Sequence, residues 1–205
     1  MHYTYDKFIT FEYHETYNYD KENHLTKATI QQGSSVTVES YTYDYAGNRL
    51  SKTINESDTT FYVNDTITDL TMVSAETDEY GKETAYYTRG DELLSMEKDG
   101  EVWYYLYDGH GSTRLLTNEA GRITDRYSYD AYGSLLEKEG DTENEFLYAG
   151  EQYNANTGLY YLRARYMNSS TGTFISMDSY QGSIYDPISL HKYLYANANP
   201  VMYTD

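Results

Sequence analysis

The sequence lacks cysteine, contains only 2 prolines, and has no long apolar run. Without cysteine, disulfides and thiolate chemistry are excluded. No stretch reaches the apolar length that spans a bilayer as a helix, and no signal peptide follows Met1. Basic residues are also scarce: 15 Lys and Arg stand against 33 Asp and Glu, a formal net charge of −18. This balance argues against nucleic acid and anionic membrane surfaces as partners, because both recruit Lys and Arg. It predicts an acidic, solvated exterior; the alternative is a surface tuned to a basic partner.

Tyrosine is the residue in excess, with 28 copies against 5 Phe and 1 Trp. The tyrosine ring packs well on a half-buried pleated surface, and its hydroxyl needs a partner or water when buried. The composition therefore predicts broad sheets with hydrogen-bonded faces in place of a dry Leu/Ile core. A chain of 205 residues is long enough for one large domain or two small ones.

A short pattern recurs along the chain: an aromatic residue, any residue, Tyr, Asp, a turn, and then Leu. Its aspartates are Asp20, Asp44, Asp65, Asp108 and Asp130. A fragment of the pattern stands at residues 3–6, and the long gap after Asp65 spans two periods, with the missing copy expected near residues 86–87. A period of about 20–25 residues is typical of a repeat architecture.

Each copy of the pattern predicts a β-hairpin. Tyrosines two residues apart point to the same face of a strand, and Asp begins a turn by accepting backbone N–H groups two residues on. Gly or Asn supplies the positive φ that the turn needs. One such hairpin is expected at residues 114–124, with its turn at residues 118–121. One hairpin cannot bury its face alone, so its stability comes from its neighbours.

Asp99-Gly100 is the strongest local turn signal, because Asp-Gly between two strand-like runs favours a two-residue loop. Such a loop fixes the register of residues 93–98 against 101–105. The expected cross-strand pairs, all on one face, are Lys98 with Glu101, Met96 with Trp103, and Leu94 with Tyr105.

Two further segments carry local signals. The acidic, polar stretch from Glu137 to Glu145 is typical of a surface loop. Asp186-Pro187 predicts a helix start, since Asp can cap and Pro fits the first helical position. A short helix is expected to extend to about Tyr195 and to stop before residues 197–200.

From about Tyr105 the chain closely resembles the core domain associated with RHS repeats. The resemblance covers the last half of the chain in ordered blocks: YDGHGSTRLLT (107–117), RYSYDAYG (126–133), YAGE (148–151), GLYYLRARY (158–166), GTFISMD (172–178) and YANANPV (195–201). The division this implies is degenerate YD-repeat hairpins at 1–100 and the RHS repeat-associated core domain at 101–205, truncated before a variable C-terminal domain.

The resemblance implies an all-β fold, in which antiparallel YD-repeat hairpins form part of a spiralling, hollow β-sheet shell. The core domain closes one end of such shells. A variable C-terminal domain, often a toxin, follows and is held inside. In many members the core cuts this junction with carboxylates, as an aspartic protease does, after an Asp-Pro-x-Gly sequence. The present chain stops at Asp205, where that sequence would begin. The resemblance also implies a secreted or cell-surface protein.

The chain departs from the family pattern near the cleavage machinery. Residues 167–169 are Met-Asn-Ser where many members have Tyr-Asp-Pro, Asp178 is followed by Ser179, and Thr173 replaces a common Arg. No second carboxylate of the kind that self-cleaving relatives use is found near Leu194. These differences weaken the expectation of self-cleavage and leave the fold expectation intact.

Three residues are candidates for function. Asp178 occupies the place where self-cleaving relatives carry a catalytic Asp, as a general acid or base in the intact parent; the alternative is a turn Asp that caps local N–H groups. Arg163 and Arg165 are expected on one strand face with Tyr161. One interpretation is a basic pair that faces a cargo or orients a site; the alternative is that both arginines stack on Tyr rings and pair with nearby Asp or Glu.

No cofactor or metal is expected. The histidines do not pair at metal-ligand spacing, and no calcium loop, phosphate loop or dinucleotide fingerprint is present. Three hypotheses follow: a structural shell fragment that encloses a C-terminal toxin, a carbohydrate or cell-surface binding module, since aromatic ladders suit sugar faces, and a self-cleaving protease domain. Under the first, the partners are the rest of the shell and a toxin domain absent here; under the second, the partner is a cell-surface glycan.

Overall fold

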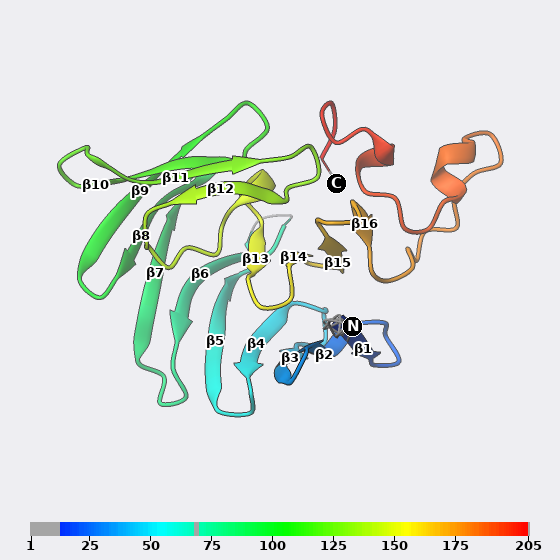
Figure 1. The fold of residues 1–205 in the computed structure, drawn as a ribbon, viewed down its shortest axis with the longest axis horizontal. Helices are drawn as coiled ribbons and strands as arrows, with labels where there is room; N and C mark the ends of the chain where they lie inside the picture. The colour runs from blue at the N-terminus through cyan, green and yellow to red at the C-terminus, as the bar shows by residue number, and fades with distance from the viewer. Residues whose placement is uncertain (1–12, 68–69, 205) are drawn as a thin grey trace, which may run out of the picture.

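The computed structural model describes residues 13–67 and 70–204, which form two antiparallel sheets (Figure 1). The large sheet contains β1 (Tyr13–Tyr19), β2 (Leu25–Gln32), β3 (Ser35–Tyr43), β4 (Arg49–Ile54), β5 (Asp58–Asp65), β6 (Met72–Thr77), β7 (Glu83–Arg89), β8 (Leu93–Lys98), β9 (Glu101–Tyr107), β10 (Thr113–Asn118), β11 (Ile123–Tyr129) and β12 (Leu135–Glu139). The small sheet contains β13 (Gln152–Asn154), β14 (Leu159–Leu162), β15 (Arg165–Asn168) and β16 (Thr173–Phe174). The described helices are three short 3₁₀ segments: η1 (Tyr148–Gly150), η2 (Pro187–Leu190) and η3 (Ala196–Ala198).

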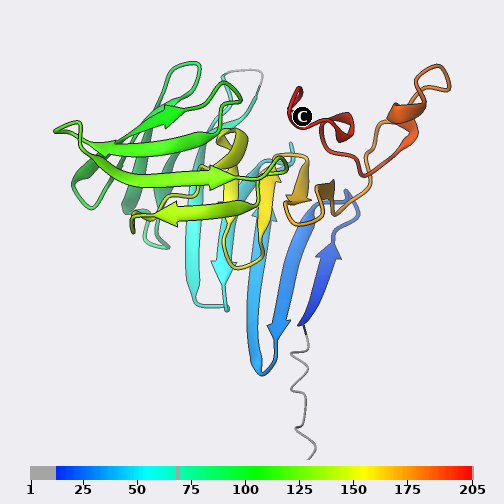
Figure 2. The same cartoon turned by 45° about the horizontal axis from the view of Figure 1, so that its top comes forward.

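Each strand of the large sheet pairs with the next strand in the sequence, so the sheet is an uninterrupted meander of hairpins. Figure 1 shows this sheet curving around the small sheet, which lies inside the curve, and Figure 2 shows the C-terminal segment projecting beyond both. The antiparallel all-β fold expected from the repeats is confirmed. The β8–β9 hairpin carries the large sheet continuously across Asp99 and Gly100.

The turns that begin at an Asp or Asn of the large sheet share one hydrogen-bond pattern. Oδ1 of Asp44 accepts the N–H groups of Ala46 and Asn48 at 2.9 Å each, and the carbonyl of Asp44 accepts the N–H of Gly47 at 3.1 Å. The same pattern recurs at Asp78, Asp108, Asn118 and Asp130. The turn missing from the long gap therefore lies at Asp78, directly before β7, the strand that contains residues 86–87. The repeat fragment at residues 3–6 lies outside the described residues.

A β-bulge follows most of these turns and shifts the side-chain alternation. Thr42 pairs with Ser51 while Tyr43 pairs with Arg49, which leaves Leu50 without an opposite residue. A bulge lets two residues oppose one and turns the local side chains. As a result Arg49 and Lys52, three residues apart, both face the interior, where Arg49 contacts the small sheet and Lys52 pairs with Glu145. The skipped positions are Thr26, Leu50, Ser74, Thr84, Leu94, Arg114, Thr124 and Leu136.

The predicted Asp-Gly hairpin is confirmed in two of its three cross-strand pairs. Lys98 pairs with Glu101 and Met96 with Trp103. The third expectation, that Leu94 shares their face, is wrong, because Leu94 is a bulge residue with 51% of its surface exposed, whereas Leu93 is 3% exposed. The hairpin predicted at residues 114–124 is confirmed as β10–β11.

Two other local expectations need correction. The segment after Asp186 forms only the 3₁₀ helix η2, and the Asp186 side chain makes no capping bond. Local serine bonds compete with a longer helix: the Ser189 hydroxyl donates to the Asp186 carbonyl at 2.6 Å and accepts the Ser183 N–H at 2.8 Å. Residues 137–139 belong to β12, so the expected loop is shorter and runs from 140 to 145.

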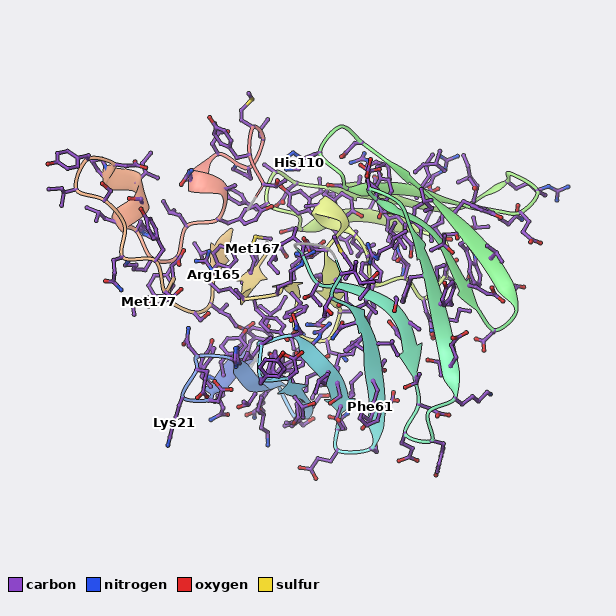
Figure 3. All side chains as sticks on the ribbon, turned by 180° about the vertical axis from the view of Figure 1, so that it is seen from behind. Lys21, Phe61, His110, Arg165, Met167 and Met177 are labelled. Carbon is purple, nitrogen blue, oxygen red and sulfur yellow. The ribbon has the colours of Figure 1, made fainter. Side chains whose placement is uncertain are left out.

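The core lies between the two sheets and is rich in tyrosine. Figure 3 shows Met167 (1% exposed) near the middle of the molecule and Phe61 (40% exposed) on its outer side.

The tyrosine before each of three turn aspartates donates its hydroxyl to a carbonyl on a neighbouring hairpin, a bond that Phe cannot make. These bonds run from Tyr43 to Leu25 at 2.7 Å, from Tyr107 to Leu93 at 2.6 Å and from Tyr129 to Thr113 at 2.7 Å.

Candidate functional site

Arg49 joins the large sheet to the small sheet. Its side chain is 2% exposed, and its guanidinium lies 4.3 Å from the ring centroid of Tyr161 on β14 and 4.7 Å from that of Tyr62 on β5. Nη2 donates to Oε1 of Gln152 on β13 at 3.0 Å, and Nη1 donates to the Tyr166 hydroxyl on β15 at 3.3 Å. An arginine combines planar stacking with several donors, which suits it to such a buried joint.

The connector at residues 140–147 forms a second set of ties. The Asp125 carboxylate on β11 accepts the Thr142 N–H at 3.1 Å and its hydroxyl at 2.6 Å. Three further contacts hold the connector. Lys98 forms an ion pair with Glu143 at 2.5 Å, the Tyr105 hydroxyl donates to Asn144 at 2.8 Å, and Lys52 forms an ion pair with Glu145. Thr113 on β10 adds bonds to the carbonyls of Phe146 and Leu147, so the connector is fixed to five strands of the large sheet before the small sheet begins.

Arg163 lies in a turn and not on a strand, which corrects the expectation that it shares a strand face with Arg165. Residues 163 and 164 form a tight hairpin turn in which Leu162 pairs with Arg165, and Arg163 adopts a φ of +52°. From this turn Nη1 of Arg163 pairs with the Glu151 carboxylate at 2.8 Å, and Nε donates to the carbonyl of Thr71 at 3.1 Å. Arg163 thus joins the β14–β15 turn of the small sheet to Thr71, the residue before β6.

Arg165 and Asp178 lie together at the other side of the turn. Nη1 of Arg165 is 3.0 Å from Oδ2 of Asp178, and its guanidinium carbon is 3.6 Å from the ring centroid of Phe174. Oδ1 of Asp178 accepts the Tyr180 N–H at 2.8 Å, as a turn aspartate does. The contacts described for Asp178 thus include one cation and a turn N–H, and the side chain remains partly exposed.

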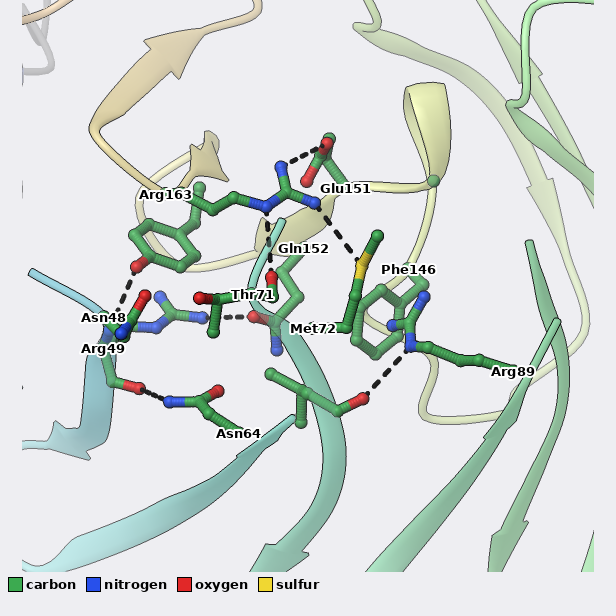
Figure 4. Close-up of a pocket in the computed structure, with 13 residues that line it drawn as sticks. Asn48, Arg49, Asn64, Thr71, Met72, Arg89, Phe146, Glu151, Gln152 and Arg163 are labelled. Atoms are coloured by element: carbon green, nitrogen blue, oxygen red, sulfur yellow. Dashed lines mark hydrogen bonds and ion pairs between the residues drawn. The ribbon is translucent and has the colours of Figure 1, made fainter. Parts of the chain in front are cut away.

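A small cavity of about 30 Å³ separates the Arg49 and Arg163 contacts (Figure 4). Arg49, Arg89, Glu151 and Arg163 are its charged lining residues. Burial raises the pKa of Glu151, an effect that Arg163 opposes, and burial lowers the pKa of Arg89. Arg89 lies over the Phe146 ring at 4.9 Å and donates from Nε to the Val73 carbonyl at 3.1 Å.

Sequence reasoning missed Arg49, Arg89 and Glu151. The one available signal was position, because Arg49 follows the Gly47-Asn48 turn directly, at the start of a returning strand. Over residues 13–67 and 70–204, no group of three His, Asp or Glu side chains is arranged to hold a metal ion. In the same residues no helix is long and apolar enough to cross a membrane.

A curved meander of Tyr-Asp hairpins that encloses a small inner sheet defines a YD-repeat shell domain. The chain belongs to the Teneurin YD-shell family, which matches residues 2–201. The expected membership in the RHS/YD-repeat proteins is thereby confirmed.

Relatives and solved structures agree with this assignment. The tRNA3(Ser)-specific nuclease WapA of Bacillus spizizenii is 39% identical over 195 residues, which are 93% of this chain and 8% of that protein. The crystal structure of TcdB2-TccC3-Cdc42 aligns with a TM-score of 0.69 at 19% identity, over 93% of this chain and 10% of that one. TcdB2-TccC3 without its hypervariable C-terminal region aligns at 0.68 and 21% identity, over the same shares. The chain therefore spans about a tenth or less of these proteins, and the structural likeness shows the fold alone.

Proposed function

We propose that this chain is the closing end of a hollow YD-repeat shell that encloses a C-terminal effector of its parent protein. The observation that carries the proposal is the small sheet inside the curve of the large one, tied to it by Arg49, Arg163 and the 140–147 connector. The role proposed for the chain is structural: it terminates the wall and fills the enclosed space at that end.

The comparisons support an enclosed effector in the parent. One relative is named as a tRNA-specific nuclease although this chain matches only 8% of it. One structural neighbour is described as lacking a hypervariable C-terminal region. A nuclease or other effector would thus belong to a different part of the parent, and export to the cell surface or beyond would place the shell where such an effector is delivered.

Protease accessibility in the longer parent tests this proposal. One variant receives a site-specific protease sequence in the region that follows residue 205. A matched variant receives it in the exposed β4–β5 turn at residues 55–57. Cutting at the turn together with protection of the downstream site is expected of an enclosed segment. Equal cutting at both sites in the folded protein contradicts enclosure.

Glycan binding has weaker support. The exposed rings of Phe61, Tyr86 and Tyr104 lie on three different strands, and no stacked pair joins them in the part of the chain that the structure describes. A sugar face needs a platform of adjacent rings, so the outer surface is not proposed as a glycan site.

A further inference from the structure

Two Asp-Gly dipeptides lie in turns of the large sheet. Asp99-Gly100 joins β8 to β9, and Asp108-Gly109 opens the turn between β9 and β10. In an Asp-Gly dipeptide the glycine nitrogen can attack the preceding carboxyl and close a five-membered succinimide ring, because glycine has no side chain to hinder the approach. The two turns therefore present the same reacting groups in different surroundings.

Exposure does not distinguish the two dipeptides. All four residues are exposed. A Cβ added at Gly100 or at Gly109 would meet nothing within 4 Å beyond its chain neighbours, so no other segment crowds either glycine. A difference in reactivity must therefore come from the carboxylates.

The two carboxylates differ in what holds them. Oδ1 of Asp108 accepts the N–H of His110 at 2.9 Å and the N–H of Ser112 at 3.1 Å. Among residues 13–67 and 70–204, no hydrogen-bond donor or ion-pair partner binds the Asp99 carboxylate, and Lys98 beside it forms its ion pair with the connector instead. The Asp99 side chain can therefore rotate toward the next main-chain nitrogen without losing a contact, whereas Asp108 must first break two bonds.

We propose that Asp99 is a site of isoaspartate formation in the folded chain and that the turn protects Asp108. The nitrogen of Gly100 bonds to Cγ of the protonated Asp99 carboxyl while the Cγ–OH bond breaks, and the N–H proton and the hydroxyl leave as one water. A second water then adds at the former main-chain carbonyl and breaks its bond to the nitrogen, so that the main chain continues through Cγ. Water is first lost and then regained, and nothing is oxidised or reduced.

The product changes the loop that sets the β8–β9 register. Isoaspartate adds one carbon to the main chain and turns the original α-carboxylate into a side group. Met96, which is fully buried, lies opposite Trp103 across this hairpin, and a change of register moves side chains to the opposite face of the sheet. The free α-carboxylate is the group that a protein-L-isoaspartate methyltransferase methylates, so an enzyme of this class is the partner that the modified site would take.

A protease that cuts before Asp but not before isoaspartate follows both dipeptides in one sample. The folded chain is incubated at neutral pH and digested at intervals. Loss of cutting before Asp99 should run at least about tenfold faster than loss before Asp108, a ratio equivalent to one or two hydrogen bonds that must break in the Asp108 turn. In urea, where the turn bonds are absent, the two rates should become similar. Asp99 reacting no faster than Asp108 in the folded chain overturns the proposal, and so does a difference that persists unchanged in urea.

Two variants test the effect on the hairpin, with fluorescence of Trp103, the only tryptophan, as the readout. Asp99→Glu blocks the reaction, because the longer side chain would have to close a six-membered ring. Asp91→Glu, at an exposed residue between β7 and β8, is the matched control. Wild type and Asp91→Glu should show a slow change in fluorescence and become substrates of an L-isoaspartate methyltransferase, and Asp99→Glu should lose both. An equal fluorescence change in Asp99→Glu overturns the effect on the hairpin. None of these results bears on whether the parent encloses an effector.

Discussion

Arg49 and Tyr161 lie 112 residues apart in the sequence and are joined twice. The backbone N–H of Arg49 donates to the Tyr161 hydroxyl at 3.0 Å, and the guanidinium of Arg49 lies 4.3 Å from the centre of the same ring. One residue at the start of β4 thus holds the middle of β14 through both its backbone and its side chain. This double contact fixes the position of the small sheet inside the large one.

Replacement of Arg49 should be among the most destabilising single changes in the chain. Arg49→Met leaves Gln152 and the Tyr166 hydroxyl without their buried donor, at a cost of about 2–4 kcal/mol in the free energy of unfolding. Arg126→Met, at a side chain that is 54% exposed, should cost less than about 0.5 kcal/mol. Urea denaturation measures both. A cost for Arg49→Met as small as that of Arg126→Met would mean that the joint contributes little to stability.

Gly81 and Gly133 occupy equivalent positions in the Asp78 and Asp130 turns and separate backbone strain from packing. Both have a left-handed φ, +76° and +87°. A Cβ at Gly81 meets nothing within 4 Å, whereas one at Gly133 lies 2.7 Å from the Tyr148 ring. Gly81→Ala should cost about 1–2 kcal/mol from strain alone. Gly133→Ala should cost at least about 1 kcal/mol more, because it also displaces a buried ring.

Thermal melts of the two glycine variants provide the comparison. Equal shifts in melting temperature would show that Tyr148 moves aside without loss and that only the backbone term matters at Gly133.

The turn carboxylates predict an acid-sensitive contribution to stability. Slight burial raises the pKa of Asp44, but bonds from the Asn48 side chain and from the N–H groups of Asn48, Ala46 and Gly47 outweigh it, so the pKa is lowered. A carboxyl with a depressed folded pKa stabilises the protein above its unfolded pKa, about 3.9. That stabilisation is lost as pH falls through the folded value.

Asp44→Ala and Asp44→Asn measure this contribution. Asp44→Ala should cost about 1–2 kcal/mol at pH 7 and less at pH 3. Asp44→Asn should cost less at pH 7, since an amide oxygen occupies the equivalent place at Asn118 and accepts the same two N–H bonds. A cost of Asp44→Ala that does not change with pH would contradict the role of the ionised carboxylate.

Asp178 is the test of self-cleavage in a natively extended parent. An aspartic mechanism needs one ionised and one protonated carboxyl, and Asp178 is paired with Arg165 at 3.0 Å. If the parent cuts itself at the junction, Asp178→Asn should abolish cutting without lowering the melting temperature by more than a few degrees. Asp141→Asn, at an exposed position, is the matched control. Gel electrophoresis measures the cutting. An Asp178→Asn protein that still cuts itself at the normal rate would show that Asp178 takes no part in the mechanism.

The local elements of the fold could be predicted because their interactions are short in sequence. The Asp turns close between residues i and i+4, and the Asp99-Gly100 hairpin is specified by the backbone preferences of two residues. The candidate site could be predicted only in part. Arg163, Arg165 and Asp178 were identified, but the strand expected to carry both arginines is interrupted at residue 163, where a non-glycine residue adopts a positive φ that no composition rule signals.

The sequence by itself determined the repeat, the antiparallel sheet and the family, since Tyr spacing, Asp turns and Gly positions act through neighbouring residues. Only the tertiary structure decided which polar side chains are buried. A bulge at Leu50 places both Arg49 and Lys52 in the interior, and their partners, Gln152 and Glu145, follow 103 and 93 residues later, respectively. The burial of these side chains depends on how the large and small sheets pack together. It also depends on the register of each strand, because a shift of one residue moves a side chain to the opposite face of the sheet.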